Sequence, residues 1–303
     1  MSENITAVSL FSGAGGMDVG FKNAGIKVLM ANEIDKMASK TFIENHPETK
    51  MIVDDINNIF PVLEEYRGVD IVFGGPPCQG FSVIGKMDPD DIRSQLIWSF
   101  LKAVEIIQPR AFVMENVKAL AAIAKWKDVR EEFIVKAKEM GYGCIPFIVN
   151  AAEYGTPQKR ERVFFIGIKG EEEFGDKFLE LLYKQKSKAP TIRELFKDLG
   201  PAGTERNPKT CSAKITYAER PVMRKIPYDC LMFNGIGRPI DPDGYSRTIT
   251  ASQGGNMTLI VDEEFLHNPN ANNWIQEYYE KLVSHEVTPK FAEAPERLRR
   301  LTI

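Results

Sequence analysis

Cys78 is the first residue whose type and position indicate chemistry. It lies in residues 74–82, Gly-Gly-Pro-Pro-Cys-Gln-Gly-Phe-Ser, which follow the apolar run 69–73. The run predicts a buried strand, and the glycines and prolines prevent a strand or helix from continuing. We therefore expect Cys78 at the carboxyl end of a strand, the edge at which open α/β sheets bind ligands. A thiol there is a candidate nucleophile, and the alternative is a small buried apolar side chain.

Glu115 is the second candidate for a catalytic role. It directly follows the apolar run 111–114, which predicts another buried strand. Because parallel strands end at the same edge of a sheet, Glu115 and Cys78 should lie at one edge. A carboxyl group placed there could act as a general acid or base; a helix cap or a surface charge is the alternative.

The first strand is expected to approach a ligand through a glycine-rich turn. The apolar run 5–10 leads into Phe-Ser-Gly-Ala-Gly-Gly-Met-Asp, residues 11–18, and a helical pattern follows. Strand, glycine turn and helix bring the backbone close to a ligand, although a plain tight turn has the same pattern. The spacing differs from Gly-x-Gly-x-x-Gly, which counts against a dehydrogenase.

Acidic residues close the next two predicted strands. A strand over residues 26–30 is followed closely by Glu33, and a carboxylate there can accept hydrogen bonds from ribose hydroxyls. Asp35 is expected to cap the helix that follows. A third short strand ends at Asp54 and Asp55, where a carboxylate could meet the amino group of an adenine.

A pair of arginines lies between two further predicted strands. Residues 143–149 and 163–167 are apolar and flank the sequence Gln-Lys-Arg-Glu-Arg, residues 158–162. Arg160 and Arg162 alternate onto one face at the start of the second strand, so they could serve a site there. The alternative is a solvated charged hairpin that closes the sheet.

Composition limits the classes of protein that fit. The chain has 303 residues, of which 43% are hydrophobic, enough for one large domain or a large and a small one. Its four cysteines and three histidines show no metal-binding spacing, and reduced thiols fit a cytosolic protein. No leader pattern and no run of 18 apolar residues indicates a membrane segment. The net charge is −3, but residues 204–250 carry eight Lys or Arg against five Asp or Glu. This local excess could contact nucleic acid or be a solvated loop region.

Together the motifs resemble those of the DNA cytosine-C5 methyltransferases of bacterial or phage restriction-modification type. The glycine-rich turn, Glu33, Asp55-Ile56, Pro-Pro-Cys-Gln, Glu-Asn-Val and Gln-x-Arg-x-Arg occur in a fixed order between residues 10 and 167. The resemblance implies an α/β fold: a doubly wound, mostly parallel sheet of S-adenosylmethionine-dependent methyltransferase type with a small irregular target-recognition domain. It suggests a catalytic domain over residues 1–190, a recognition and support region over 191–260, and a return segment over 261–303.

The resemblance also implies a reaction. The Cys78 thiolate would add to C6 of a cytosine flipped out of duplex DNA, and protonated Glu115 would contact N3. Arg162 would meet O2, with Arg160 beside the catalytic loop. The methyl group would pass from S-adenosyl-L-methionine to C5, leaving S-adenosyl-L-homocysteine, without a metal.

Further roles follow from the resemblance alone. A mobile loop over residues 85–91 would close over the DNA. The cofactor would be bound by Phe11, Ser12, Gly13, Gly15, Gly16, Met17, Glu33, Ile34, Asp55, Ile56, Pro76 and Leu96. The DNA would be bound by Gln79, Ser82, Gln158, Arg160, Arg238 and Arg247.

Two alternatives remain open. A tRNA cytosine-5 methyltransferase of the same superfamily usually carries Pro-Phe-Thr after the Gln, whereas this chain has Gly80-Phe81-Ser82. The other is a non-catalytic or split-subunit DNA-binding chain. A helix is expected over residues 272–283, and the family's C-terminal Gly-Asn-Ser/Ala-Val motif does not occur after residue 255. We therefore expect either a second polypeptide that supplies this motif or a weakly active chain.

The resemblance places the protein in the cytoplasm of a bacterium, an archaeon or a phage-infected cell.

Overall fold

The computed structural model describes residues 5–77, 95–249 and 255–302. The predictions for Cys78, Gln79, Ser82 and the loop 85–91 lie outside these residues. The chain forms two compact units, which we call the sheet unit (Met1–Val149 and Glu161–Lys184) and the second unit (Asn150–Arg160 and Gln185–Ile303). The division into residues 1–190, 191–260 and 261–303 stays a functional proposal.

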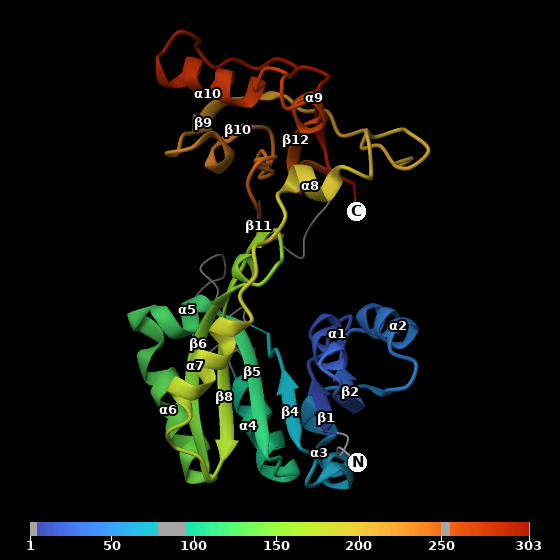
Figure 1. The fold of residues 1–303 in the computed structure, drawn as a ribbon, viewed down its shortest axis with the longest axis vertical. Helices are drawn as coiled ribbons and strands as arrows, with labels where there is room; N and C mark the ends of the chain where they lie inside the picture. The colour runs from blue at the N-terminus through green and yellow to red at the C-terminus, as the bar shows by residue number, and fades with distance from the viewer. Residues whose placement is uncertain (1–4, 78–94, 250–254, 303) are drawn as a thin grey trace. The chain divides into compact units, whose positions relative to one another are not determined.

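The sheet unit is built on seven strands in the order β3-β2-β1-β4-β5-β8-β6 (Figure 1). The first five of these are parallel to their neighbours, and β8 is antiparallel to β5. The predicted α/β fold with a mostly parallel sheet is therefore confirmed. The strands are β1 (Thr6–Leu10), β2 (Lys27–Glu33), β3 (Lys50–Val53), β4 (Ile71–Gly74), β5 (Ala111–Val117), β6 (Tyr142–Asn150) and β8 (Glu161–Lys169).

Helices cover both faces of this sheet. Successive residues of β1, Ala7 and Val8, belong to different apolar clusters because side chains alternate across a strand. The cluster of Ala7 includes Phe21 of α1, and that of Val8 includes Phe100 of α4 and Phe133 of α6. The helices are α1 (Gly16–Asn23), α2 (Lys36–Asn45), α3 (Phe60–Leu63), α4 (Leu96–Ile107), α5 (Lys118–Ala122), α6 (Lys127–Glu139) and α7 (Gly175–Lys184).

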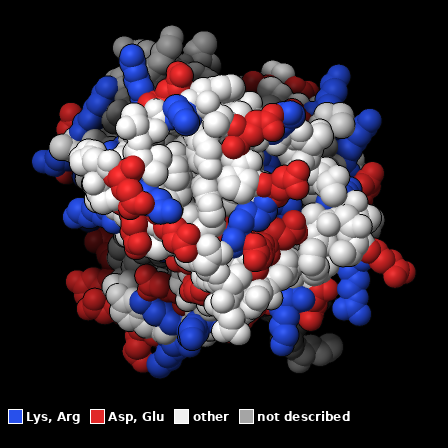
Figure 2. Space-filling model, turned by 90° about the horizontal axis from the view of Figure 1, so that it is seen from above, with Lys and Arg blue, Asp and Glu red and all other residues white. Residues whose placement is uncertain are grey.

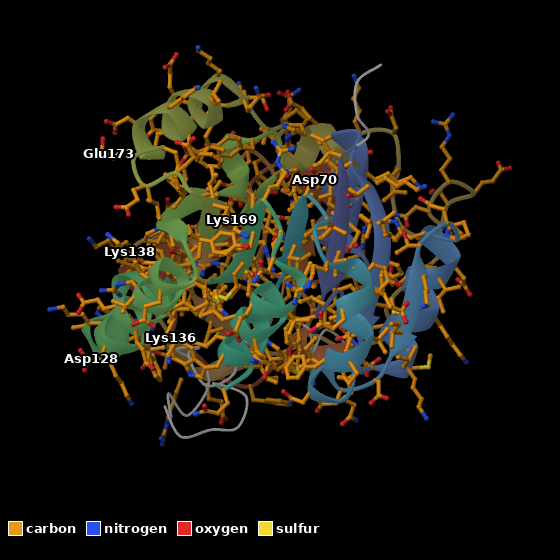
Figure 3. All side chains as sticks on the ribbon, turned by 90° about the horizontal axis from the view of Figure 1, so that it is seen from below. Asp70, Asp128, Lys136, Lys138, Lys169 and Glu173 are labelled. Atoms are coloured by element: carbon orange, nitrogen blue, oxygen red, sulfur yellow. The ribbon has the colours of Figure 1, made fainter. Side chains whose placement is uncertain are left out.

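The parallel register brings the predicted motifs to one edge of the sheet. Leu10 pairs with Asn32 on one side and Gly74 on the other, and Gly74 pairs with Met114. The residues that follow these positions include the glycine-rich turn, Glu33, the prolines before Cys78, and Glu115. Figure 3 views the opposite edge, where Asp70 precedes β4 and Lys169 ends β8.

The second unit contains short strand pairs around an aromatic cluster. Tyr217, Phe233, Trp274 and Tyr278 pack together, with the rings of Trp274 and Tyr278 stacked at 5.1 Å between centroids. The predicted helix over 272–283 is observed as α10. The pairs are β7 (Gln158–Lys159) with β11 (Ser246–Arg247), β9 (Tyr217–Val222) with β10 (Leu231–Phe233), and β12 (Ile260–Asp262) with β13 (Leu298–Arg300). The helices are α8 (Ile192–Phe196), α9 (Glu263–His267) and α10 (Trp274–Val283).

Surface charge is mixed. On the face shown in Figure 2, basic and acidic side chains are interspersed among uncharged residues. Within the described residues, no helix has the length and apolar character needed to cross a bilayer. No group of three or more His, Cys, Asp or Glu side chains in the same part of the chain could hold a metal ion.

Candidate active site

Glu115 and Arg162 form an ion pair at the carboxyl edge of β5. Their strands are antiparallel neighbours, with Glu115 opposite Phe164 and Val117 opposite Arg162, so the two side chains meet diagonally. Glu115 Oε1 lies 2.8 Å from Arg162 Nε, and the side chains are 20% and 19% exposed. A second Arg162 nitrogen, Nη1, donates to the Glu161 carbonyl at 2.8 Å. The edge therefore holds a half-buried carboxylate and a guanidinium in direct contact.

The segment that leads to Cys78 is attached to this same place. A Cβ atom on Gly75 would lie 3.2 Å from Glu115 Oε2, so glycine lets the backbone pass close to the carboxylate. The Asn116 side chain is buried, and its Nδ2 donates to the Pro76 carbonyl at 3.3 Å. Pro76, two residues before Cys78, is thus bonded to the residue that follows Glu115, while the predicted position of Cys78 itself lies outside the described residues.

Arg160 and Gln158 belong to the second unit. The Arg160 N–H donates to Asn150 Oδ1 at 3.2 Å, and its carbonyl accepts from the Ala151 N–H at 2.9 Å. Gln158 pairs with Ser246 in the β7–β11 ladder. Arg162 lies beside Glu115 in the sheet unit, whereas Arg160 belongs to the second unit.

The glycine-rich turn is tied to the end of β2 through Glu33. Glu33 Oε2 accepts from the Gly13 N–H at 2.8 Å, and Oε1 accepts from the Asp35 N–H at 2.9 Å. Ser12 adds a bond from its N–H to the Asn32 carbonyl at 3.0 Å. The carboxylate therefore lies against the turn, where two of the predicted cofactor motifs meet. Asp35 caps α2 as expected, accepting from the N–H groups of Met37 and Ala38.

Gly15 opens the first helix. Its φ of 88° is left-handed, which glycine adopts without strain, and it precedes α1 without a side-chain cap. The first N–H groups of α1 are therefore available to a ligand beside the turn.

The other predicted cofactor residues differ in exposure. Asp55 caps a short turn, accepting from the Asn57 N–H at 2.8 Å, and Ile56 is buried. Ile34 is 64% exposed. Met17 and Leu96 pack against the apolar clusters of the sheet.

Two buried asparagines, neither of them predicted as a site residue, hold the strand ends together. Asn32 Nδ2 donates to the carbonyls of Asp54 at 2.8 Å and Ile52 at 3.2 Å, which joins β2 to β3. Asn116 does the same between β5 and the residues after β4. The available signal was a polar amide at the end of an apolar strand, since a buried amide needs hydrogen-bond partners.

Other cysteines are poor nucleophile candidates. Burial raises the pKa of Cys144 to about 12. It also raises the pKa of Cys230, whose sulfur accepts from the Arg224 N–H at 3.1 Å. Both thiols therefore stay protonated near neutral pH, where a nucleophile must ionise.

Arg238 and Arg247, predicted to bind DNA, converge on one residue of the second unit. Arg238 Nε donates to the Asp229 carbonyl at 3.2 Å, and Arg247 forms an ion pair with the Asp229 carboxylate. Burial lowers the pKa of Arg247 from its usual high value. The structure thus brings these two arginines together around Asp229.

The sheet order and the glycine-rich turn at the carboxyl edge of the strands define a Rossmann-like α/β fold. The sequence model of the C-5 cytosine-specific DNA methylase family matches residues 5–303, and the chain belongs to that family.

Curated relatives are methyltransferases of restriction-modification type. Type II methyltransferase M.DdeI of Desulfomicrobium norvegicum is 36% identical over 197 residues, 63% of this chain and 48% of that protein. Type II methyltransferase M.AquIA of a Picosynechococcus strain is 41% identical over 174 residues, 53% of this chain and 70% of that protein. The chain thus spans about half the length of M.DdeI.

A solved structure shares the fold. The Dnmt2 methyltransferase of S. pombe has a TM-score of 0.62 and 17% identity, with 99% of this chain and 84% of that chain covered. At that identity, the likeness supports the fold class alone.

Proposed function

We propose that this chain transfers a methyl group from S-adenosyl-L-methionine to C5 of a cytosine in a short, specific duplex DNA sequence. The observation that carries the proposal is the edge of the sheet unit. There the Glu115–Arg162 pair lies against Gly75, and the residues after Pro76 lead to Cys78. The glycine-rich turn and Glu33 lie at the same edge.

Cys78 is the proposed nucleophile. Its thiolate forms a bond to C6 of cytosine, and the electrons of the C5–C6 double bond become available at C5. C5 then bonds to the methyl carbon as the bond from that carbon to sulfur breaks. Loss of the C5 proton to a base restores the double bond and expels Cys78.

Glu115 and Arg162 are proposed to hold the base during this addition. The adduct places negative charge on the N3 and O2 side of the ring. A proton on Glu115 would be shared with N3, and the guanidinium of Arg162 would meet O2. Because the two side chains already lie in contact, the N3 partner and the O2 partner would reach the base from the same side.

The cofactor is proposed to bind at the glycine-rich turn, where it supplies an electrophilic methyl group on a sulfonium. Glu33 has an N–H bonded to each oxygen, and a carboxylate retains further acceptor sites for ribose hydroxyls. The remaining residues proposed to line this site are Phe11, Ser12, Gly13, Gly15, Gly16, Met17, Ile34, Asp55, Ile56, Pro76 and Leu96.

DNA is the proposed substrate, with the target base flipped out of the duplex. Flipping costs a few kcal/mol of unstacking, so the enzyme must supply that much from contacts to the rest of the site. We assign these contacts to Gln79, Ser82, Gln158, Arg160, Arg238 and Arg247. A cytoplasmic location in a bacterium, an archaeon or a phage-infected cell fits this role.

A second polypeptide is proposed as a further partner. Two apolar side chains next to the predicted cofactor residues are exposed, Val19 at 47% and Met37 at 70%. Exposed apolar surface of this kind usually becomes covered by a ligand or a partner.

The test is the transfer of tritiated methyl from S-adenosyl-L-methionine. Duplex DNA and tRNA are offered in parallel to the purified chain, and bisulfite sequencing of DNA from expressing cells locates the product. Label in DNA at a short cytosine-containing sequence supports the proposal. Label in tRNA alone would assign the chain to the tRNA-modifying alternative.

A further inference from the structure

Three polar side chains are buried beneath the glycine-rich turn. Ser9, Asp18 and His46 are 0%, 0% and 3% exposed. The Ser9 hydroxyl and the His46 ring face Asp18, but no well-formed hydrogen bond reaches the Ser9 Oγ, either carboxylate oxygen of Asp18 or the Nε2 of His46. Ser9 lies on β1, Asp18 in the first turn of α1, and His46 at the end of α2. These three elements surround the residues that would hold the methyl donor.

Such a cluster is costly to bury. An unpaired polar group in the interior loses the hydrogen bonds that water gave it, and a carboxylate loses more. Burial raises the pKa of Asp18, while the facing Ser9 hydroxyl and His46 ring act in the opposite direction. Buried groups of this kind in native proteins need an explanation, which is often a role at a functional site.

His46 contacts the turn directly. A Cβ atom on Gly15 would lie 2.5 Å from His46 Nε2 and 3.0 Å from Phe42 Cδ2, so the imidazole fills the space under Gly15. The His46 ring also packs on Phe42, with 4.6 Å between the ring centroids. The His46 N–H is fixed by a 2.8 Å bond to the Phe42 carbonyl. The end of α2 therefore supports the left-handed backbone at Gly15 from below.

Asp18 lies in the first turn of α1, three residues after Gly15, where the helix carries no side-chain cap. Its side chain faces Ser9 of β1 and the His46 ring that lies under Gly15. Asp18 is therefore linked to the turn through its own helix and through His46.

We propose that Asp18 and His46 are positioning residues for the methyl donor. They hold the glycine-rich turn, residues 11–16, in its ligand-ready shape, and the protein gives up stability to keep them. The inference rests on the proposed binding of S-adenosyl-L-methionine at this turn.

The experiment measures binding and stability in the same variants. Calorimetric titration of the full chain with S-adenosyl-L-methionine and S-adenosyl-L-homocysteine gives both Kd values, and thermal unfolding gives Tm. The variant Asp18→Asn keeps the shape of the side chain but removes its charge. Asp128→Asn is the matched control, because Asp128 is an exposed carboxylate in the first turn of α6.

Asp18→Asn should weaken both ligands by the same factor, tenfold or more, with Tm unchanged or higher. A structural role alone predicts the opposite: a lower Tm, down to failure to fold, with no separate loss of affinity. Either that pattern or unchanged Kd values would overturn the proposal. Loss of S-adenosyl-L-methionine binding alone would also overturn it, since it would show a charge effect on the sulfonium instead of a positioning effect.

His46→Phe supplies an independent second variant that keeps an aromatic ring against Phe42. It should weaken both ligands as Asp18→Asn does, and the double variant should be no weaker than the poorer single variant, because the two residues act on one turn. Additive losses would contradict joint positioning. If the unaltered chain binds neither ligand, the proposed cofactor site itself fails. If Glu33→Ala alone loses binding, only the present inference fails.

Discussion

Glu115 is required by the proposed chemistry to carry a proton, yet it is paired with Arg162. The Arg162 guanidinium lies 2.8 Å from the Glu115 carboxylate, and a positive charge at such a distance favours the ionised form of a carboxyl group. In the proposed reaction the arriving cytosine would draw Arg162 toward O2, and Glu115 would take up a proton from solvent and share it with N3. On this proposal the ion pair separates when the base binds, and each side chain then contacts a different atom of the cytosine ring.

Replacement of Glu115 by Gln tests this exchange. Glutamine can still donate a hydrogen bond to N3 but cannot deliver a proton, so methyl transfer should fall by about 10²–10⁴-fold. The Kd for S-adenosyl-L-methionine should stay within a factor of about two to three, because the cofactor motifs use other strand ends. Single-turnover kinetics with duplex DNA and calorimetry provide the two numbers. A parallel loss of cofactor affinity would show that Glu115 belongs to the cofactor site.

Cys78→Ala and Glu33→Ala should separate the two halves of the site. Cys78→Ala removes the nucleophile, so methyl transfer should disappear while cofactor binding persists. Glu33→Ala should instead weaken cofactor binding first, since it removes the acceptor that lies against Gly13. A DNA substrate with 5-fluorocytosine at the target should trap a covalent adduct at Cys78, because fluorine cannot leave as a proton does. Continued turnover by Cys78→Ala would rule out the covalent route.

Asp18 predicts a specific pH dependence of stability. Its folded-state pKa is raised above 3.8, mainly by burial, so folding favours the protonated form. This contribution is present at low pH and is lost as pH rises through the folded-state pKa. Asp18→Asn should therefore gain stability relative to the parent as pH rises above about 4.

The measurement is urea unfolding at several pH values. His46 is the other titratable group facing Asp18, so both chains carry His46→Phe. A difference in unfolding free energy that stays constant with pH would contradict the burial of a titrating Asp18.

At the scale of elements, the ends of β4 and β5 are joined by Asn116. Its side chain links two points 40 residues apart, and it is buried. Asn116→Ala leaves the Pro76 carbonyl without this donor, so unfolding free energy should fall by about 1–3 kcal/mol. Methyl transfer should fall further than stability accounts for, because the segment before Cys78 loses its attachment. Denaturant unfolding and transfer assays compare the two effects; equal stability with full activity would assign the bond no role.

Much of this edge could be predicted because its elements are local patterns. The apolar runs 5–10, 69–73 and 111–114 each became a buried strand, and Asp35 capped α2 through neighbours two and three residues away. The side-chain partners across the edge could not be predicted. Glu33 reaches Gly13 over 20 residues, and that pairing depends on how β1 and β2 align.

Exposed apolar side chains bear on whether the chain is active without a second polypeptide. Val19 and Met37 expose apolar side chains beside the cofactor residues. If a second polypeptide covers them, the purified 303-residue chain should bind cofactor weakly and transfer methyl slowly. Transfer assays and analytical ultracentrifugation test this directly. Full activity as a monomer, with tight cofactor binding, would show that this chain completes its own site.

Residues 150–160 belong to the second unit although they are encoded between two strands of the sheet unit. Their β7 is held by β11: the Ser246 N–H donates to the Pro157 carbonyl at 2.9 Å, and Thr248 Oγ1 donates to the Lys159 carbonyl at 2.9 Å. If two related genes recombined after residue 184, the hybrid protein would have β7 from one parent and β11 from the other. We therefore expect hybrid genes joined at that point to be more active when β7 and β11 come from the same parent than when they come from different parents.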